Sequence, residues 1–170
     1  MKKYSYPFLF TATVTFLLCA FLLVLWDRTI YSTTFLNQAT SQYVILSAMA
    51  ISFPVALLLV SKGIVKNGKL SGYLKLYAGA SMLMVMLLAP FVITLTYLLP
   101  GEYASYKAPY EYAYRSRNSC SGAHVYDPDL GKNIRICYPK GNYKFNSEVY
   151  VEKRSNMLGA VVTYAATFPL

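Results

Sequence analysis

The stretch that decides the fold is residues 76–99, LYAGASMLMVMLLAPFVITLTYLL, which contains no Asp, Glu, Lys, Arg or His. At a rise of ~1.5 Å per residue, a helix needs about 20 apolar residues to cross ~30 Å of hydrocarbon. Two similar stretches precede it, residues 7–26 and 43–60. Because backbone polar groups cannot remain unpaired in lipid, the sequence predicts three transmembrane helices, which form an anchor over residues 1–100.

Two prolines, Pro54 and Pro90, fall inside the second and third stretches. A membrane helix tolerates proline where neighbouring groups satisfy the freed carbonyl, so we expect local kinks. The alternative is three buried helices of a soluble protein. It requires a large apolar partner surface, which the residues after position 100 are too few to supply.

The composition also separates the chain into two parts. Hydrophobic residues make up 56% and charged residues 14% of the 170 residues, against about 25% charged in an average soluble protein. Most of the charges follow residue 100. This asymmetry argues against a soluble globular protein, the length of 170 residues excludes a large multidomain enzyme, and the aromatic content of 16% argues against a disordered chain.

Basic residues near the predicted spans set the expected orientation. Lys2 and Lys3 precede the first span, residues 61–75 carry four lysines and no acid, and Arg28 is balanced by Asp27. The positive-inside rule therefore predicts a cytoplasmic N-terminus and an exported domain over residues 101–170. We expect a bacterial inner-membrane protein with a periplasmic domain. The lysines near the bilayer surface explain much of the net charge of +9, so we expect no nucleic-acid partner.

The first span is expected to stay in the protein as an anchor. Its apolar run continues without a small-residue cleavage site, unlike a cleaved signal peptide. Lipidation at Cys19 is not expected, because the bulky Leu18 precedes it and apolar sequence follows.

Small residues recur four apart on two of the predicted helices and would allow close helix packing. Packing within a three-helix bundle is the expected role, and a seam between copies of the chain is the alternative. The spans carry no charged residue, which disfavours a proton-coupled transporter or pump. The residues are Thr11, Thr15 and Cys19 on the first span and Ala48, Ser52 and Ala56 on the second.

Short alternating segments after residue 100 predict strands at 110–114, 123–126, 133–138, 148–152 and 160–167. Turn residues such as Asp127-Pro128-Asp129 separate them. The expected fold is thus a membrane α+β protein, with three transmembrane helices followed by an antiparallel β-meander of four or five strands.

A disulfide is expected between Cys120 and Cys137, the two cysteines outside the predicted spans. The predicted topology puts both in an oxidising compartment, and a domain this small needs a staple. Zinc is the alternative use of the pair, with His124 and Asp127 as further ligands, but the spacing fits no zinc pattern. We therefore expect no metal and no cofactor.

No catalytic arrangement is recognisable, and we expect the protein not to be an enzyme. The lone histidine, His124, has only Ser119 and Ser121 nearby, which read as turn residues. Cys120 and Cys137 are too far apart in the sequence for a Cys-x-x-Cys redox motif. Carboxylate pairs could be drawn for a glycosidase, but Asp127 and Asp129 flank a turn proline.

Tyrosine and arginine are enriched at protein contact sites, and more than half of the 17 tyrosines follow residue 100. Their densest group is the candidate partner-binding surface. Equally open are a role in the core of a small sheet and a role as an aromatic belt above the bilayer. The group consists of Tyr103, Tyr106, Tyr110, Tyr112, Tyr114, Arg115 and Arg117.

In overall plan the chain resembles small bacterial inner-membrane proteins that act in phage superinfection exclusion or in immunity to membrane-active toxins. The resemblance lies in "MKKYSYPFLF" (1–10) opening a retained span, the three spans, and "CSGAHVYDPDLGKNIRICYPKGNY" (120–143) in one exported domain. It implies a non-enzymatic protein that binds and blocks an incoming foreign protein at the envelope. The alternatives are an accessory subunit of a resident transporter or secretion complex, and a membrane-bound enzyme.

Overall fold

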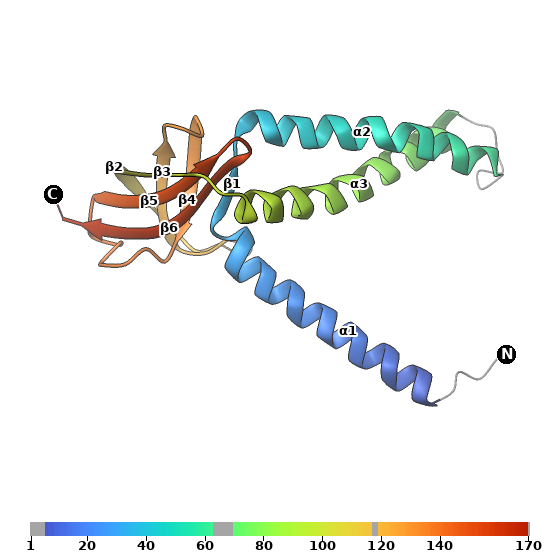
Figure 1. The fold of residues 1–170 in the computed structure, drawn as a ribbon, viewed down its shortest axis with the longest axis horizontal. Coiled ribbons are helices and arrows are strands. Elements are labelled where there is room, and N and C mark those ends of the chain that lie inside the picture. The colour runs from blue at the N-terminus through green and yellow to red at the C-terminus, as the bar shows by residue number, and fades with distance from the viewer. Residues whose placement is uncertain (1–5, 63–69, 117–118, 170) are drawn as a thin grey trace.

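The computed structural model describes residues 6–62, 70–116 and 119–169 (Figure 1). In these residues, three helices are long and apolar enough to cross a membrane, and an antiparallel six-stranded sheet gathers at one end of them. The helical elements are α1 (Tyr6–Trp26) with its π-helical continuation η1 (Asp27–Tyr31), α2 (Gln38–Ser61) and α3 (Leu70–Leu98). The strands are β1 (Thr34–Leu36), β2 (Glu102–Ala113), β3 (Gly122–Asp127), β4 (Lys132–Cys137), β5 (Glu148–Asn156) and β6 (Gly159–Phe168).

The helices coincide with the predicted spans but extend beyond them. Helix α2 begins five residues before the predicted start at residue 43, because Asn37 caps it. The Asn37 side-chain oxygen accepts a hydrogen bond from the Thr40 amide at 2.6 Å, which satisfies one of the free N–H groups at the helix start. The polar first turn of α2 is therefore helical, although it lies outside the apolar run.

Helices α2 and α3 pack against each other through small residues. Ala48, Ser52 and Ala56 are fully buried, and the Ser52 and Ser81 hydroxyls hydrogen-bond at 2.7 Å across the interface. The Tyr77 hydroxyl donates to the Met49 carbonyl at 3.2 Å. These contacts bring the two backbones close together, as small residues do in membrane helix pairs.

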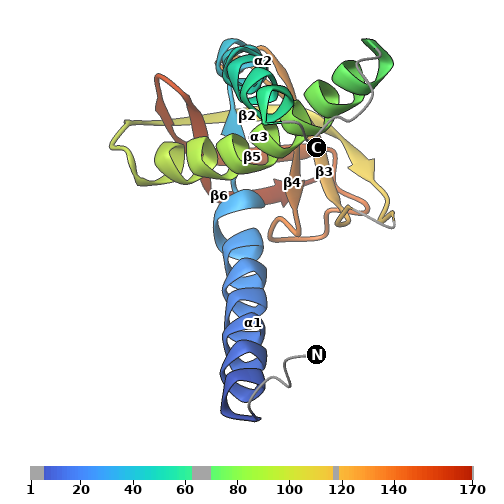
Figure 2. The same cartoon turned by 90° about the vertical axis from the view of Figure 1, so that its right-hand side faces the viewer.

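Helix α1 does not pack against this pair in the described residues, so packing of α1 in a three-helix bundle stays a prediction. Thr11, Thr15 and Cys19 are exposed, and α1 diverges from α2 and α3 in both views (Figures 1 and 2). Contact with α3 is made instead by η1, and the Trp26 indole donates to the Thr94 hydroxyl at 2.8 Å. The apolar side chains of α1 are not confined to one face, so no face of it is specified for burial.

The sheet has the order β1-β6-β5-β2-β3-β4, which differs from the predicted simple meander. Strands β2, β3 and β4 do follow one another, but β5 then pairs with the opposite edge of β2. β1, from the connection between the first two helices, adds to β6. Alternation within each segment predicts a strand, but it does not identify the neighbouring strand.

The sheet is nearly closed on itself. The Nζ of Lys132, on edge strand β4, donates to the carbonyl of Leu36 on edge strand β1. Burial lowers the pKa of Lys132. The core inside the sheet is built from Val125, Ile134, Val149 and Val151 and their neighbours on the alternating inward positions.

The sheet is fixed to the helices through the β5–β6 hairpin. The Arg154 guanidinium donates to the Tyr97 carbonyl, and the Asn156 amide donates to the Thr96 carbonyl at 2.9 Å. On the other side of the hairpin, the backbone N–H of Asn37 donates to the Leu158 carbonyl at 3.0 Å. We call this end of the sheet the proximal end and the opposite end, away from the helices, the distal end.

The predicted disulfide between Cys120 and Cys137 is present, with 5.6 Å between the two Cα atoms. It joins the start of β3 to the end of β4 at the distal end, where Gly122 pairs with Cys137. Replacing both cysteines by serine should lower the free energy of unfolding of the sheet by about 3 kcal/mol, because the unfolded chain gains the freedom of the opened loop. Chemical denaturation followed by tyrosine fluorescence measures this loss.

Cys19→Ser is the matched control, because Cys19 is a free, exposed cysteine on α1. It should leave the unfolding midpoint of the sheet unchanged. Equal stability of the double serine variant and the unmodified protein would show that the disulfide does not hold the sheet together.

Candidate partner-binding site

The tyrosines of the predicted cluster divide between the core and the surface. Tyr106 and Tyr110 lie on inward positions of β2 and pack against the core of the sheet. Tyr103 and Tyr114 are 79% and 78% exposed and lie near opposite ends of β2. Arg115 is exposed, whereas Arg117 lies outside the described residues.

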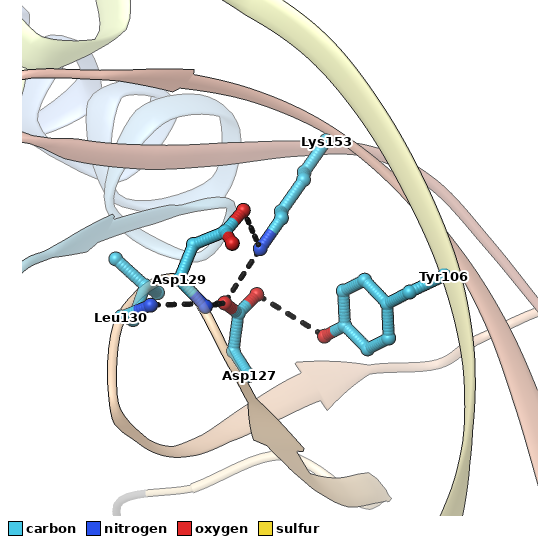
Figure 3. A network of polar contacts seen from close by, with 5 residues as sticks. All are labelled: Tyr106, Asp127, Asp129, Leu130 and Lys153. Carbon is cyan, nitrogen blue, oxygen red and sulfur yellow. Dashed lines mark hydrogen bonds and ion pairs between the residues drawn. The ribbon is translucent and has the colours of Figure 1, made fainter.

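Tyr106 belongs to a buried polar network with Asp127, Lys153 and Asp129 (Figure 3). The Tyr106 hydroxyl donates to Asp127 Oδ2 at 3.1 Å. Lys153 Nζ lies 2.5 Å from Asp127 Oδ1 and 2.8 Å from Asp129 Oδ2. Lys153 and Asp127 are almost completely buried, with 1% and 0% exposure. Removal of these charges from water is costly, and the pairing offsets that cost.

The Asp127 carboxylate is fully occupied. Its Oδ1 also accepts from the backbone amides of Asp129 and Leu130, at 3.0 and 3.1 Å, which fixes the turn between β3 and β4. The network lines neither the apolar pocket beside Tyr43 and Leu95 nor the pocket beside His124 and Tyr126. A fully buried carboxylate with four donors stabilises the turn and the inside of the sheet.

The remaining aromatic residues gather at the distal end. The Tyr112 ring lies 4.6 Å from that of Tyr114 and 6.0 Å from that of Tyr143, measured between centroids. Tyr110 supports this group from the core, because its hydroxyl donates to the Tyr143 carbonyl at 2.9 Å. We call Tyr112, Tyr114 and Tyr143 the distal cluster.

Further exposed aromatic residues flank the distal cluster. Tyr138, Phe145 and Phe168 are 58%, 82% and 47% exposed, and each lies at or beyond the distal end of the strands. The sequence did not identify these residues or Tyr143 as candidates. A signal was present for Tyr143 and Phe145, because they lie in a turn that contains Gly and Asn, where an aromatic side chain is seldom buried. Exposed basic residues accompany them: Arg115, Lys140 and Lys144.

The residues considered for a zinc site and for catalysis have other partners or positions in the structure. The disulfide occupies both sulfur atoms that a zinc site would have used. His124 lies on the outer face of β3, opposite Glu111 on β2 and Arg135 on β4. Arg135 donates to the Ser119 hydroxyl at 2.5 Å, so Ser119 is a partner of the guanidinium.

The buried network makes the free energy of unfolding depend on pH in the alkaline range. Burial, and then the charges of Asp127 and Asp129, raise the pKa of the Tyr106 phenol well above its usual value of 10.0. The folded state therefore keeps the phenol protonated at pH values where the unfolded chain releases the proton. This contribution to stability is complete below about pH 10 and decreases as the pH rises above it.

We predict that the free energy of unfolding falls between pH 9 and 11 by about 1 kcal/mol more in the unmodified protein than in Tyr106→Phe, because one pKa unit corresponds to 1.36 kcal/mol. Urea denaturation at several pH values measures the difference, and Tyr103→Phe is the exposed control. Parallel pH profiles for the unmodified protein and Tyr106→Phe would contradict burial of Tyr106 against Asp127.

No protein-family model, curated protein or solved structure matches this chain. Its function must therefore be inferred from its own residues, and among the described residues the distal end offers the densest exposed aromatic surface outside the apolar helices.

Proposed function

We propose that the protein is a non-enzymatic inner-membrane protein whose periplasmic sheet and helices bind and block an incoming foreign protein at the bacterial envelope. The carrying observation is the set of exposed rings at the distal end, away from the apolar helices: Tyr114, Tyr138, Phe145 and Phe168. In this arrangement the helices span the bilayer, the lysine-containing connection between α2 and α3 is cytoplasmic, and the distal end faces the periplasm.

The chemistry of the distal end supports protein recognition. Tyr114 and Phe145 expose large rigid rings whose burial in an interface would cost little conformational entropy. Arg115, Lys140 and Lys144 are the nearby cations in the sequence, so the favoured partner presents an acidic surface. Lys140 lies 4.8 Å from the centre of the Tyr164 ring, which holds one of these cations on the sheet.

The proximal joint supports a blocking role. Arg154 and Asn156 bind the carbonyl end of α3, so the sheet is not a loosely tethered module. A partner bound at the distal end would be held at a fixed distance and orientation relative to the bilayer. This is the geometry needed to stop a membrane-crossing protein without a chemical reaction.

The alternative function, an accessory subunit of a resident transporter or secretion complex, has one observation in its favour. The apolar segment of helix α1 is not buried by the rest of the described chain. Its surface is therefore open to helices of another protein or of a second copy of this chain. The two functions differ in which surface carries activity: the distal end for the blocker and α1 for the subunit.

The test is protection of a susceptible bacterium that expresses the protein and is challenged with a panel of phages and membrane-active protein toxins. We expect at least a tenfold loss of plating or killing for one agent. Tyr114→Ala/Phe145→Ala should abolish protection at unchanged protein level, because it removes the two most exposed distal rings.

Tyr103→Ala is the matched control, since Tyr103 is as exposed as Tyr114 but lies near the proximal end of β2. It should protect as well as the unmodified protein. The proposal fails if no agent is excluded, or if the distal variant protects fully. Loss of a resident membrane complex on deletion of the gene would instead support the accessory-subunit function.

A further inference from the structure

A small pocket with a mixed polar and apolar lining lies over β2, β3 and β4, mainly on the outer face of the sheet. Its volume is about 290 Å³, near the lower limit of ordinary ligand sites, so it accommodates a single ring-sized unit. It is shallow and open to solvent, so a longer ligand could extend beyond it. Its lining residues are Pro109, Tyr110, Glu111, His124, Tyr126 and Asn133.

The register of the strands explains why these side chains converge. His124 and Tyr126 are two residues apart on β3 and share its outer face, since Val125 between them belongs to the core. His124 is directly opposite Glu111, and Tyr126 is directly opposite Asn133. Directly opposed side chains on one face have Cβ atoms about 5 Å apart, so one ligand can reach all four.

The Tyr110 hydroxyl is bonded to the Tyr143 carbonyl, but the other four polar side chains of the pocket are unused within the part of the chain that the structure describes. The side chains of Glu111, His124 and Asn133 and the Tyr126 hydroxyl have no hydrogen-bond or ion-pair partner there. This differs from the interior of the sheet, where every polar atom of Asp127 is paired. The pocket therefore offers one carboxylate, one imidazole, one amide and one phenol to a ligand.

The charge of the pocket narrows the ligand class. Glu111 repels an anion, and a single carboxylate beside one imidazole is a poor site for a hard cation, which prefers six or more oxygen ligands. Arg135, next to His124 on β4, is held by Ser119 and by the Cys120 carbonyl at 3.3 Å and is not free to neutralise an acidic ligand. A neutral ligand rich in both hydrogen-bond donors and acceptors fits best.

The exposed ring of Tyr126 restricts the class of ligand further. Tyr126 is 56% exposed, so its ring face is open to an apolar surface. A pyranose ring has such a surface in its C–H groups, with hydroxyl groups around its edge. The hydroxyls can donate to Glu111 and exchange hydrogen bonds with Asn133 and His124.

We propose that this outer-face pocket binds one sugar ring of a neutral glycan, with the ring stacked on Tyr126 and its hydroxyls bonded to Glu111, Asn133 and His124. None of the three tyrosines of the distal cluster lines this pocket, and sugar binding does not depend on the function proposed for that cluster. The sheet is already attached to the helices at its proximal end. Sugar binding would attach it in addition to a polysaccharide next to the membrane.

The test uses the full chain in phosphatidylcholine nanodiscs, because sugar-based detergents would compete for the site. Saturation-transfer NMR is recorded with neutral tetrasaccharides of β-1,4-linked glucose, β-1,4-linked N-acetylglucosamine and α-linked mannose. We expect signal transfer to one of them, and at least a tenfold weaker Kd for Tyr126→Ala and for Glu111→Gln. Tyr103→Ala, the exposed tyrosine outside the pocket, should bind normally.

Three results would overturn the proposal: no transfer to any tetrasaccharide, equal binding by the pocket variants and the unmodified protein, or equally tight binding of an anionic tetragalacturonate. Protease resistance of the sheet checks that each variant is folded. Glu111→Gln keeps the size of the side chain, so its effect reports the lost carboxylate and not a lost fold.

Discussion

A helix leaves the last four of its carbonyl groups without partners, and a helix that crosses hydrocarbon must end where water or protein supplies them. In this protein the β5–β6 hairpin supplies two of them, because Arg154 and Asn156 donate to the carbonyls of Tyr97 and Thr96 at the end of α3. The same hairpin pairs with β1, just before α2 begins. The proximal end of the sheet is therefore fixed to the end of α3 and to the start of α2 (Figure 1). The position of the distal end follows from this joint.

The interior of the sheet contains the buried ion pair of Lys153 and Asp127. Well-packed apolar side chains of similar volume would stabilise the sheet as much as this pair does. Lys153 and Asp127 lose hydration on burial, and such pairs stabilise little relative to well-packed apolar residues. Their effect is geometric, because Asp127 joins β5, the β3–β4 turn and Tyr106 of β2 through one carboxylate. This fixes how the strands face each other, and hence which side chains reach the outer pocket and the distal end.

Strong local signals in the sequence predict much of the fold. Long uncharged runs predict α1, α2 and α3, alternation predicts five of the six strands, and two isolated cysteines predict the disulfide. Features that depend on distant residues are not predictable in this way. Examples are the three-residue strand β1, the pairing of β5 with β2, and the separation of α1 from the other helices. For the candidate site, the sequence identifies a tyrosine-rich segment. Only the structure shows that Tyr106 and Tyr110 pack against the core, while the exposed Tyr114 packs on the half-buried Tyr112, which stacks on Tyr143.

The proposed function requires the sheet and the α2–α3 connection to lie on opposite sides of a membrane. Single cysteines at Lys107 on β2 and at Lys62 after α2, in a Cys19→Ser background, test this directly with a membrane-impermeant maleimide. In intact spheroplasts we predict labelling of Lys107→Cys and none of Lys62→Cys, with both labelled after permeabilisation. Labelling of Lys62→Cys alone in intact spheroplasts would place the sheet in the cytoplasm and contradict the proposed role at the envelope.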